Sequence, residues 1–268
     1  MSDPEIATKA PESDAMESSA ISEHDSRAQT GASMGEHCTT DRPTSGQDPS
    51  GVLSNFDDIR VYISKPADYP SSPGKLLLLL TGGTGVHSIN NQLQADMYAR
   101  EGFVVIMPDQ FAGDPAPNSK TEETDSNPTF IEKVKIGAAE TVKSFMLDMW
   151  LARHTTEKTL PILHKVLESA KDEYADAVSN GGGIYAAGYC FGAKYVLLLA
   201  SEHPDPVLAG EEGKDEEAGA ASKGPLIKVG AIAHASLVTR EDVKAIKAPV
   251  SMVCVGMSTA VTGRRYVC

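Results

Sequence analysis

One cysteine of this sequence stands where a thiol can act as a nucleophile. Cys190 is the centre of the pentapeptide 188–192 (G-Y-C-F-G), which follows one apolar run and precedes another. A G-x-nucleophile-x-G pentapeptide between a strand and a helix is typical of a cramped turn that lifts its central side chain above a sheet. Flanking glycines are needed because side chains there would collide with the adjacent strand and helix. The pattern predicts that Cys190 projects into a cleft as a nucleophile; the alternative is a buried, inert cysteine.

Backbone amides near Cys190 are candidate partners for a reacting carbonyl oxygen. A helix that starts after Cys190 favours a thiolate at its amino end, and its first amide, that of Phe191, can donate to an oxyanion. A second donor is expected from the loop after Leu80, where Gly82 and Gly83 let the backbone approach a substrate closely.

Other polar residues follow predicted strands, and each has two interpretations. His234 follows a strand and is either a base for Cys190 or a structural histidine. His87, in a glycine-rich loop, lines the pocket or is solvated. Asp109 and Asp114 bind substrate or stabilise a turn. Histidines at helical or loop positions are expected at the surface: His154, His164 and His203.

The elements that must position these residues can be read from apolar runs and glycine punctuation. Helices are expected after the glycine-rich loop up to Gly102 and at about 130–151, 159–178 (capped by Thr159, with Pro161 in the first turn) and 193–200. Strands are expected at 60–64 (an edge strand), 75–81, 103–107, 183–187, 229–233 and 250–255.

Strands that alternate with helices in this way predict an α/β fold with a doubly wound, mostly parallel sheet. Ligands of such sheets gather at the carboxyl ends of the strands, and Cys190 lies at one of these ends.

Composition excludes several classes of partner. The formal charge of −13 and the pI near 5.0 oppose binding to nucleic acid. The chain shows no leader pattern, and its longest apolar run, Leu76–Leu80, is too short to span a bilayer, so a cytoplasmic protein without a membrane partner is expected. The four scattered cysteines form no CxxC, which argues against a disulfide framework or a zinc site and fits a reducing compartment.

The chain divides into two parts by composition. Residues 1–50 are rich in Ser, Thr, Asp, Glu, Gly and Pro and are predicted to form a disordered tail. Residues 51–268 have enough apolar sequence for one folded domain.

The sequence resembles the dienelactone hydrolase family, particularly its fungal members, over about 51–256. The resemblance rests on the turn at Cys190 and on the segments 81–91, 108–114 and 234–239. It implies an α/β-hydrolase fold and the hydrolysis of small carboxylic esters or lactones by a Cys-His-Asp triad, through an acyl-enzyme and without a metal or cofactor. By matched motif, Cys190 is the nucleophile, and the amides of Phe191 and Gly83 are the oxyanion donors.

Two departures from the family stand out. Some members have a glutamate near the resting cysteine, at the position that Gly82 occupies here. The family's triad acid and histidine belong beyond the strand at 250–255, yet residues 256–268 contain no Asp, Glu or His. We therefore expect a domain that lacks its last αβ unit, from a truncated or altered reading of a longer gene. The alternative to an esterase is a catalytically incomplete protein that binds a small molecule or a partner chain.

Overall fold

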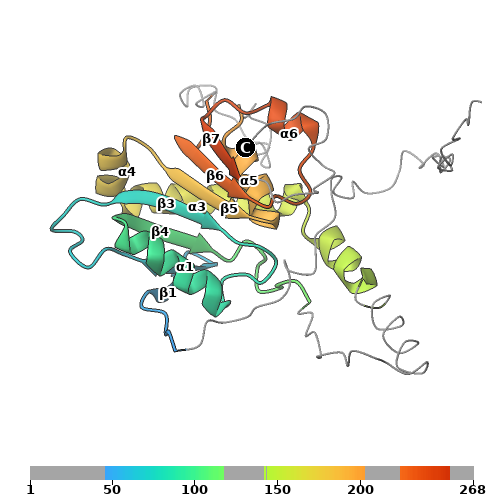
Figure 1. Ribbon diagram of the computed structural model, residues 1–268, viewed down its shortest axis with the longest axis horizontal. Helices are drawn as coiled ribbons and strands as arrows, with labels where there is room; N and C mark the ends of the chain where they lie inside the picture. The colour runs from blue at the N-terminus through green and yellow to red at the C-terminus, as the bar shows by residue number, and fades with distance from the viewer. Residues whose placement is uncertain (1–45, 118–141, 143, 203–223, 254–268) are drawn as a thin grey trace, which may run out of the picture.

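The computed structural model describes residues 46–117, 142, 144–202 and 224–253, which form a seven-stranded mixed sheet with helices on both faces (Figure 1). The order across the sheet is β1-β2-β4-β3-β5-β6-β7; pairs that include β2 are antiparallel and the others are parallel. The predicted doubly wound, mostly parallel sheet of the α/β-hydrolase type is confirmed. The strands are β1 (Val52–Phe56), β2 (Ile59–Ser64), β3 (Lys75–Leu80), β4 (Phe103–Pro108), β5 (Tyr185–Tyr189), β6 (Val229–Ala233) and β7 (Val250–Val253).

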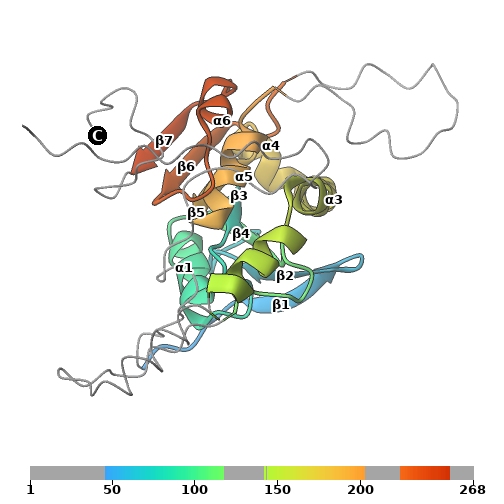
Figure 2. The same ribbon diagram turned by 90° about the vertical axis from the view of Figure 1, so that its right-hand side faces the viewer.

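Helices cover the sheet from two sides (Figure 2). Helix α1 (Ile89–Arg100) packs on one face, whereas α3 (Thr156–Glu173), α4 (Ala175–Gly181) and α5 (Phe191–Leu199) pack on the other. A short helix, α6 (Arg240–Lys244), connects β6 to β7. The chain leaves β3 through α1 toward β4, and leaves β5 through α5 toward β6. The carboxyl ends of β3 and β5 therefore flank the switch point at which doubly wound sheets bind ligands.

The leucine run of β3 explains why this strand lies at the centre of the sheet. Leu76, Leu78 and Leu80 are buried in the core shared with α3 and α5, and Leu77 and Leu79 are buried in the core beneath α1. Successive side chains of a strand point to opposite faces, so a continuous apolar run suits a strand that is covered on both sides.

The prediction of an edge strand at 60–64 is wrong, because β2 lies between β1 and β4. The edge strand beside β2 is β1, which the sequence did not predict. Its first four side chains are exposed, so its adjacent Val52 and Leu53 give no alternating pattern.

The helix predicted over 159–178 starts earlier and is interrupted. Its N-cap is Thr155, whereas Thr159 is buried and Pro161 lies inside α3 rather than in its first turn. Tyr174, at φ −122° and ψ 41°, separates α3 from α4.

In the part of the chain that the structure describes, no helix combines the length and the hydropathy needed to cross a bilayer. Most of the predicted N-terminal tail and the C-terminal segment 254–268, in which triad partners were sought, lie outside the described residues.

Candidate active site

The predicted strand–turn–helix at Cys190 is confirmed. Strand β5 runs directly into Cys190, and α5 starts at the next residue with Cys190 as its N-cap. Cys190 has φ 51° and ψ −114°, a conformation that residues with a side chain rarely adopt. Such strain persists only where the surroundings enforce it, and it concentrates at functional sites.

Both flanking glycines are sterically required, as the sequence predicted. A Cβ on Gly188 would lie 2.6 Å from Cγ2 of Val196 in α5 and 2.8 Å from the carbonyl oxygen of Gly192. A Cβ on Gly192 would lie 2.3 Å from the carbonyl oxygen of Leu80 in β3. The turn is therefore compressed between its own helix and the adjacent strand.

The loop after β3 lies beside this turn, where the second oxyanion donor was expected. Leu80 pairs with Gly188, and the amide of Gly192 donates to the carbonyl of Thr81 at 3.0 Å. Gly83 is two residues farther along this loop. The Phe191 amide occupies the first position of α5, where a helical N–H has no acceptor within the helix. The assignment of both amides as oxyanion donors stays a prediction.

The expectation that Cys190 projects into a cleft as a thiol is wrong for this structure. Cys190 is only 1% exposed, and it is disulfide-bonded. No second cysteine lies within the described ranges. Any chemistry of the Cys190 thiolate therefore requires reduction and an opening of the site.

The turn after β6 closes over Cys190, and sequence reasoning missed its principal residue, Ser236. The Ser236 amide donates to the carbonyl of Cys190 at 3.1 Å, and the Ser236 Oγ lies 3.3 Å from the Cys190 Sγ. On the other side of the turn, the Cys190 amide donates to the carbonyl of Ala233 at 3.3 Å. The segment 234–239 was identified from the sequence, but no local signal marked its serine.

No hydrogen bond joins His234 to Cys190 in the described part of the chain. Its amide donates to Val253 of β7, and its ring centroid lies 6.3 Å from that of Tyr189. Tyr189 in turn shares a hydrogen bond with the hydroxyl of Tyr98 in α1. Burial, and then this hydrogen bond, raise the pKa of Tyr189 well above its ordinary value. The contacts of His234 are thus with Val253 and Tyr189, and its role as a base stays a prediction.

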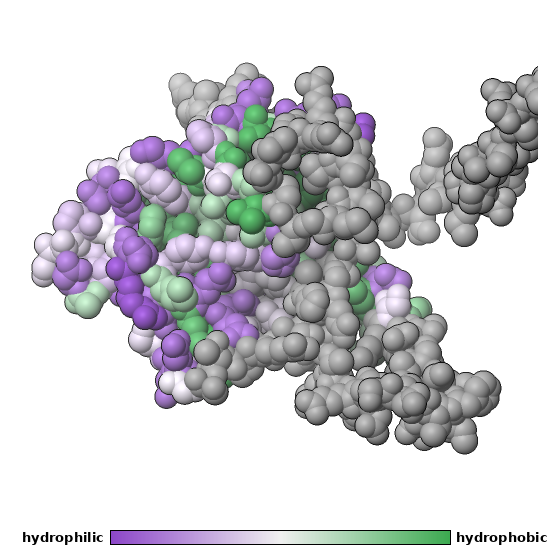
Figure 3. Space-filling model, viewed as in Figure 1, coloured by the Kyte–Doolittle hydropathy of each residue, from purple (hydrophilic) through white to green (hydrophobic). Residues whose placement is uncertain are grey.

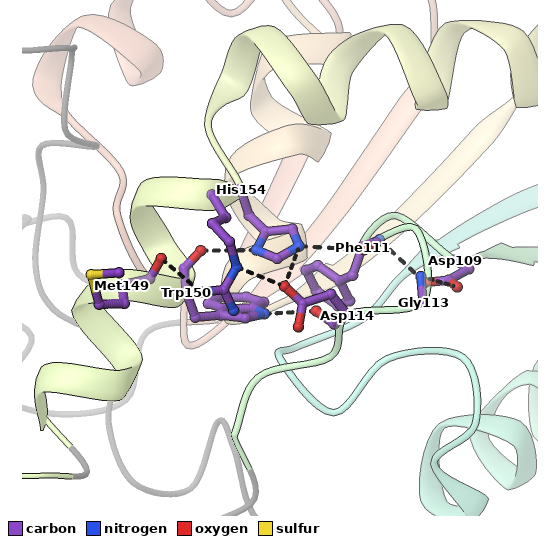
Figure 4. Close-up of polar contacts among 8 residues, drawn as sticks. Asp109, Phe111, Gly113, Asp114, Met149, Trp150 and His154 are labelled. Carbon is purple, nitrogen blue, oxygen red and sulfur yellow. Dashed lines mark hydrogen bonds and ion pairs between the residues drawn. The ribbon is translucent and has the colours of Figure 1, made fainter.

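The other two predicted pocket residues, His87 and Asp109, form no hydrogen bond with Cys190 in the described ranges. His87 is exposed in the loop before α1. Asp109 is buried, and its carboxylate accepts the amides of Phe111 at 3.2 Å and Gly113 at 2.8 Å (Figure 4). Of the two interpretations of Asp109, these contacts support turn stabilisation.

Asp114 connects the loop after β4 to the helical residues 144–153 (Figure 4). Its carboxylate accepts from Arg153 at 2.9 Å, and its backbone carbonyl accepts from the Trp150 indole at 2.7 Å. His154, predicted at the surface, is instead buried, with Nδ1 2.8 Å from the Trp150 carbonyl oxygen. That prediction failed because a helical position does not reveal which face of the helix is covered.

Aromatic rings connect this junction to the turn at Cys190. Phe191, the residue after Cys190, packs against Phe111 and Trp150 with ring centroids 5.2 and 5.3 Å apart. Lys194 lies one helical turn farther along α5; burial lowers its pKa, and the charges of Asp242 and Glu157 oppose that effect. The start of α5 thus packs against aromatic side chains, and the buried Lys194 lies nearby.

No group of three or more His, Cys, Asp or Glu side chains that could hold a metal ion occurs among the described residues.

Comparisons with known proteins relate this chain to one hydrolase family. The sequence model of the dienelactone hydrolase family matches residues 59–210, more than half of the chain and including the turn at Cys190. Hydrolase tropI of Talaromyces stipitatus is 32% identical over 204 residues, which cover 76% of this chain and 64% of that protein. Hydrolase pyvD of Aspergillus violaceofuscus is 30% identical over 202 residues, covering 75% and 62%.

The chain thus spans about three fifths of the length of these curated relatives. Among solved structures, Thermogutta terrifontis esterase 2 superposes with a TM-score of 0.44 at 12% identity, covering 80% of this chain and 85% of that one.

Proposed function

Since the chain belongs to the dienelactone hydrolase family, we propose that it hydrolyses small carboxylic esters or lactones with the reduced Cys190 as its nucleophile. The observation that carries the proposal is the strained backbone of Cys190, held between β5 and α5 by two glycines without room for a side chain. The substrate in this proposal is a small molecule, and the place of action is the reducing cytoplasm, where Cys190 is a thiol.

The reaction proceeds in two steps. The Cys190 thiolate attacks the carbonyl carbon, and the amides of Phe191 and Gly83 stabilise the oxyanion. Collapse of this intermediate breaks the ester bond, and the leaving alkoxide takes up a proton. Water then attacks the thioester, which releases the carboxylic acid and restores the thiol; a lactone yields a single hydroxy acid.

Proton transfer is the demanding part of this scheme. Neither His234 nor His87 forms a hydrogen bond with Cys190 within the described residues, so no general base is assigned there. General acid–base catalysis contributes about 10²–10⁴-fold in rate. We therefore expect the 268-residue chain to acylate readily and to deacylate slowly.

The test follows hydrolysis of p-nitrophenyl acetate by the chain after reduction with dithiothreitol and removal of the reductant. The expected result is a burst of nitrophenol close to one equivalent per chain, followed by a slow steady state. Cys190→Ala abolishes the burst, whereas the matched controls Cys38→Ser, Cys254→Ser and Cys268→Ser retain it. A burst that survives Cys190→Ala, or no burst from any reduced chain, refutes the cysteine hydrolase.

The burial of Cys190 at 1% exposure favours a second candidate, a catalytically incomplete member of the fold that binds a small molecule or a partner chain. The same assay separates the two candidates. Reduced chain that melts cooperatively but gives no Cys190-dependent burst supports the binding protein.

A further inference from the structure

We infer that Ser236 is a positioning residue for Cys190: its hydroxyl holds the sulfur and stabilises the thiolate. The inference deepens the proposed function and rests on it, because a stabilised thiolate matters only if Cys190 is the nucleophile. It adds a donor that belongs neither to α5 nor to the loop after β3.

Three hydrogen bonds join the end of β6 and the turn after it to Cys190. The Cys190 amide donates to Ala233, the Ser236 amide donates to the Cys190 carbonyl, and the Ser236 Oγ lies 3.3 Å from the Sγ. Ser236 is itself only 5% exposed. Backbone contacts on both sides of Cys190 thus fix the position from which the hydroxyl reaches the sulfur.

The direction of the side-chain hydrogen bond follows from the chemistry of the sulfur. The Cys190 sulfur is in a disulfide and carries no proton, so the Ser236 hydroxyl must donate. After reduction, the same donor faces a thiolate at the same place. A hydrogen bond to an ionised acceptor is stronger than one to a neutral acceptor, so this contact favours the charged form.

A hydrogen-bond donor beside the sulfur offsets the cost of burying a thiolate at this site. Burial disfavours a thiolate, and Cys190 is almost completely buried. The amino end of α5 offers partial positive charge, and Ser236 adds a directed hydrogen bond.

The conformation of the turn indicates that the placement of Ser236 is enforced. His234 and Leu237, on either side of Ser236, have positive φ angles of 38° and 61°. Residues with side chains adopt such angles only where surrounding contacts compensate the strain. Here those contacts include the hydrogen bonds to Cys190.

The experiment measures ionisation of the Cys190 thiol, which does not depend on ester turnover. Reduced wild type, Ser236→Ala, Ser236→Thr and Ser236→Val are treated with iodoacetamide over a range of pH. Carbamidomethylation is followed by mass spectrometry on tryptic peptide 172–194, whose only cysteine is Cys190. Thr and Val have nearly the same shape, so this pair separates the hydroxyl from packing.

We expect Ser236→Ala and Ser236→Val to slow alkylation at neutral pH by about tenfold and to move the pH profile upward, whereas Ser236→Thr stays within about twofold of wild type. Identical profiles for all four proteins overturn the inference, as does a Thr variant that behaves like Val. If Ser236→Ala does not fold, the comparison of Ser236→Thr with Ser236→Val still tests whether the hydroxyl stabilises the thiolate.

Failure of the proposed function gives a different pattern. If Cys190 is not the nucleophile, the nitrophenol burst is absent or independent of Cys190, whatever the alkylation series shows. If only the inference fails, the Cys190-dependent burst is present and the Ser236 variants alkylate with the wild-type pH profile.

Discussion

The backbone of Cys190 concentrates strain at one residue, and that strain can be measured. A side chain at φ 51° and ψ −114° is unfavourable, whereas glycine tolerates such angles. Cys190→Gly is therefore expected to exceed Cys190→Ala in free energy of unfolding by about 1 kcal/mol. Both variants lack the disulfide, so urea denaturation of the pair isolates the backbone effect. Equal stability would show that the turn relaxes around alanine.

Gly192 tests the steric argument independently of the cysteine. Its Cβ would lie 2.3 Å from the carbonyl oxygen of Leu80, a backbone atom that cannot rotate away. We expect Gly192→Ala to lower the free energy of unfolding by about 3 kcal/mol, the upper end of the usual overpacking cost. The control is Gly181→Ala in α4, whose nearest atom is a Tyr185 ring carbon at 3.2 Å. A Gly192 variant as stable as that control would contradict the compressed turn.

Sequence reasoning identified the turn at Cys190 because its requirements are local: a glycine on each side, a strand before and a helix after. It failed on Ser236 and on the burial of Cys190 because both depend on a contact between segments 46 positions apart. A serine after a strand has no periodicity or spacing that marks it. Only the paired carboxyl ends of β5 and β6 bring it to the sulfur.

Among the elements, the strands that form apolar runs were predictable, whereas β1 and α6 were not. The apolar runs of β3 and β4 reflect strands covered on both faces. By contrast, β1 has little buried surface, and α6 is a five-residue helix set by a capping box between Thr239 and Asp242. Short elements held by caps or edge pairing leave too weak a pattern in the sequence.

Helix α1 is fastened to β2 and to the chain before β1 through one buried carboxylate. Asp96 accepts the hydroxyls of Tyr62 at 2.9 Å and Ser64 at 2.6 Å, and the amide of Ser50 at 2.7 Å. Burial alone raises the pKa of Asp96, but these hydrogen bonds outweigh it and hold the pKa below its ordinary value of 3.8. The folded chain therefore prefers the carboxylate.

Replacing this carboxylate should destabilise the protein in a pH-dependent way. We expect Asp96→Asn to lower the free energy of unfolding by about 2–3 kcal/mol near neutral pH. The folded pKa is depressed, so the stabilisation is complete above the unfolded value and is lost as pH falls through the folded one. Urea denaturation from about pH 3 to 7 should show the difference shrinking in acid. The exposed Asp58→Asn is the control, and a pH-independent difference would reject the carboxylate's role.

The whole molecule is acidic, and the largest group of exposed apolar side chains at helical spacing in its described part lies on one helix. Helical residues 144–153 and the preceding turn expose four apolar side chains at helical spacing: Val142, Phe145, Met146 and Met149. Figure 3 shows apolar surface at the place of this helix beside hydrophilic residues. The helix is anchored to the loop after β4 through Arg153 and Trp150, so the stripe is presented on a fixed element.

An exposed apolar stripe of this kind favours self-association of the chain. Sedimentation velocity should show the average mass rising with protein concentration, despite the formal charge of −13, which opposes contact between copies. The double variant Phe145→Lys/Met149→Lys should remain monomeric over the same range, because two added charges would have to be desolvated in any apolar contact. The control is Met97→Lys, which changes an isolated side chain of α1 that is 62% exposed. A wild-type chain that stays monomeric throughout, or a control that suppresses association equally, would show that the stripe does not mediate contacts between copies.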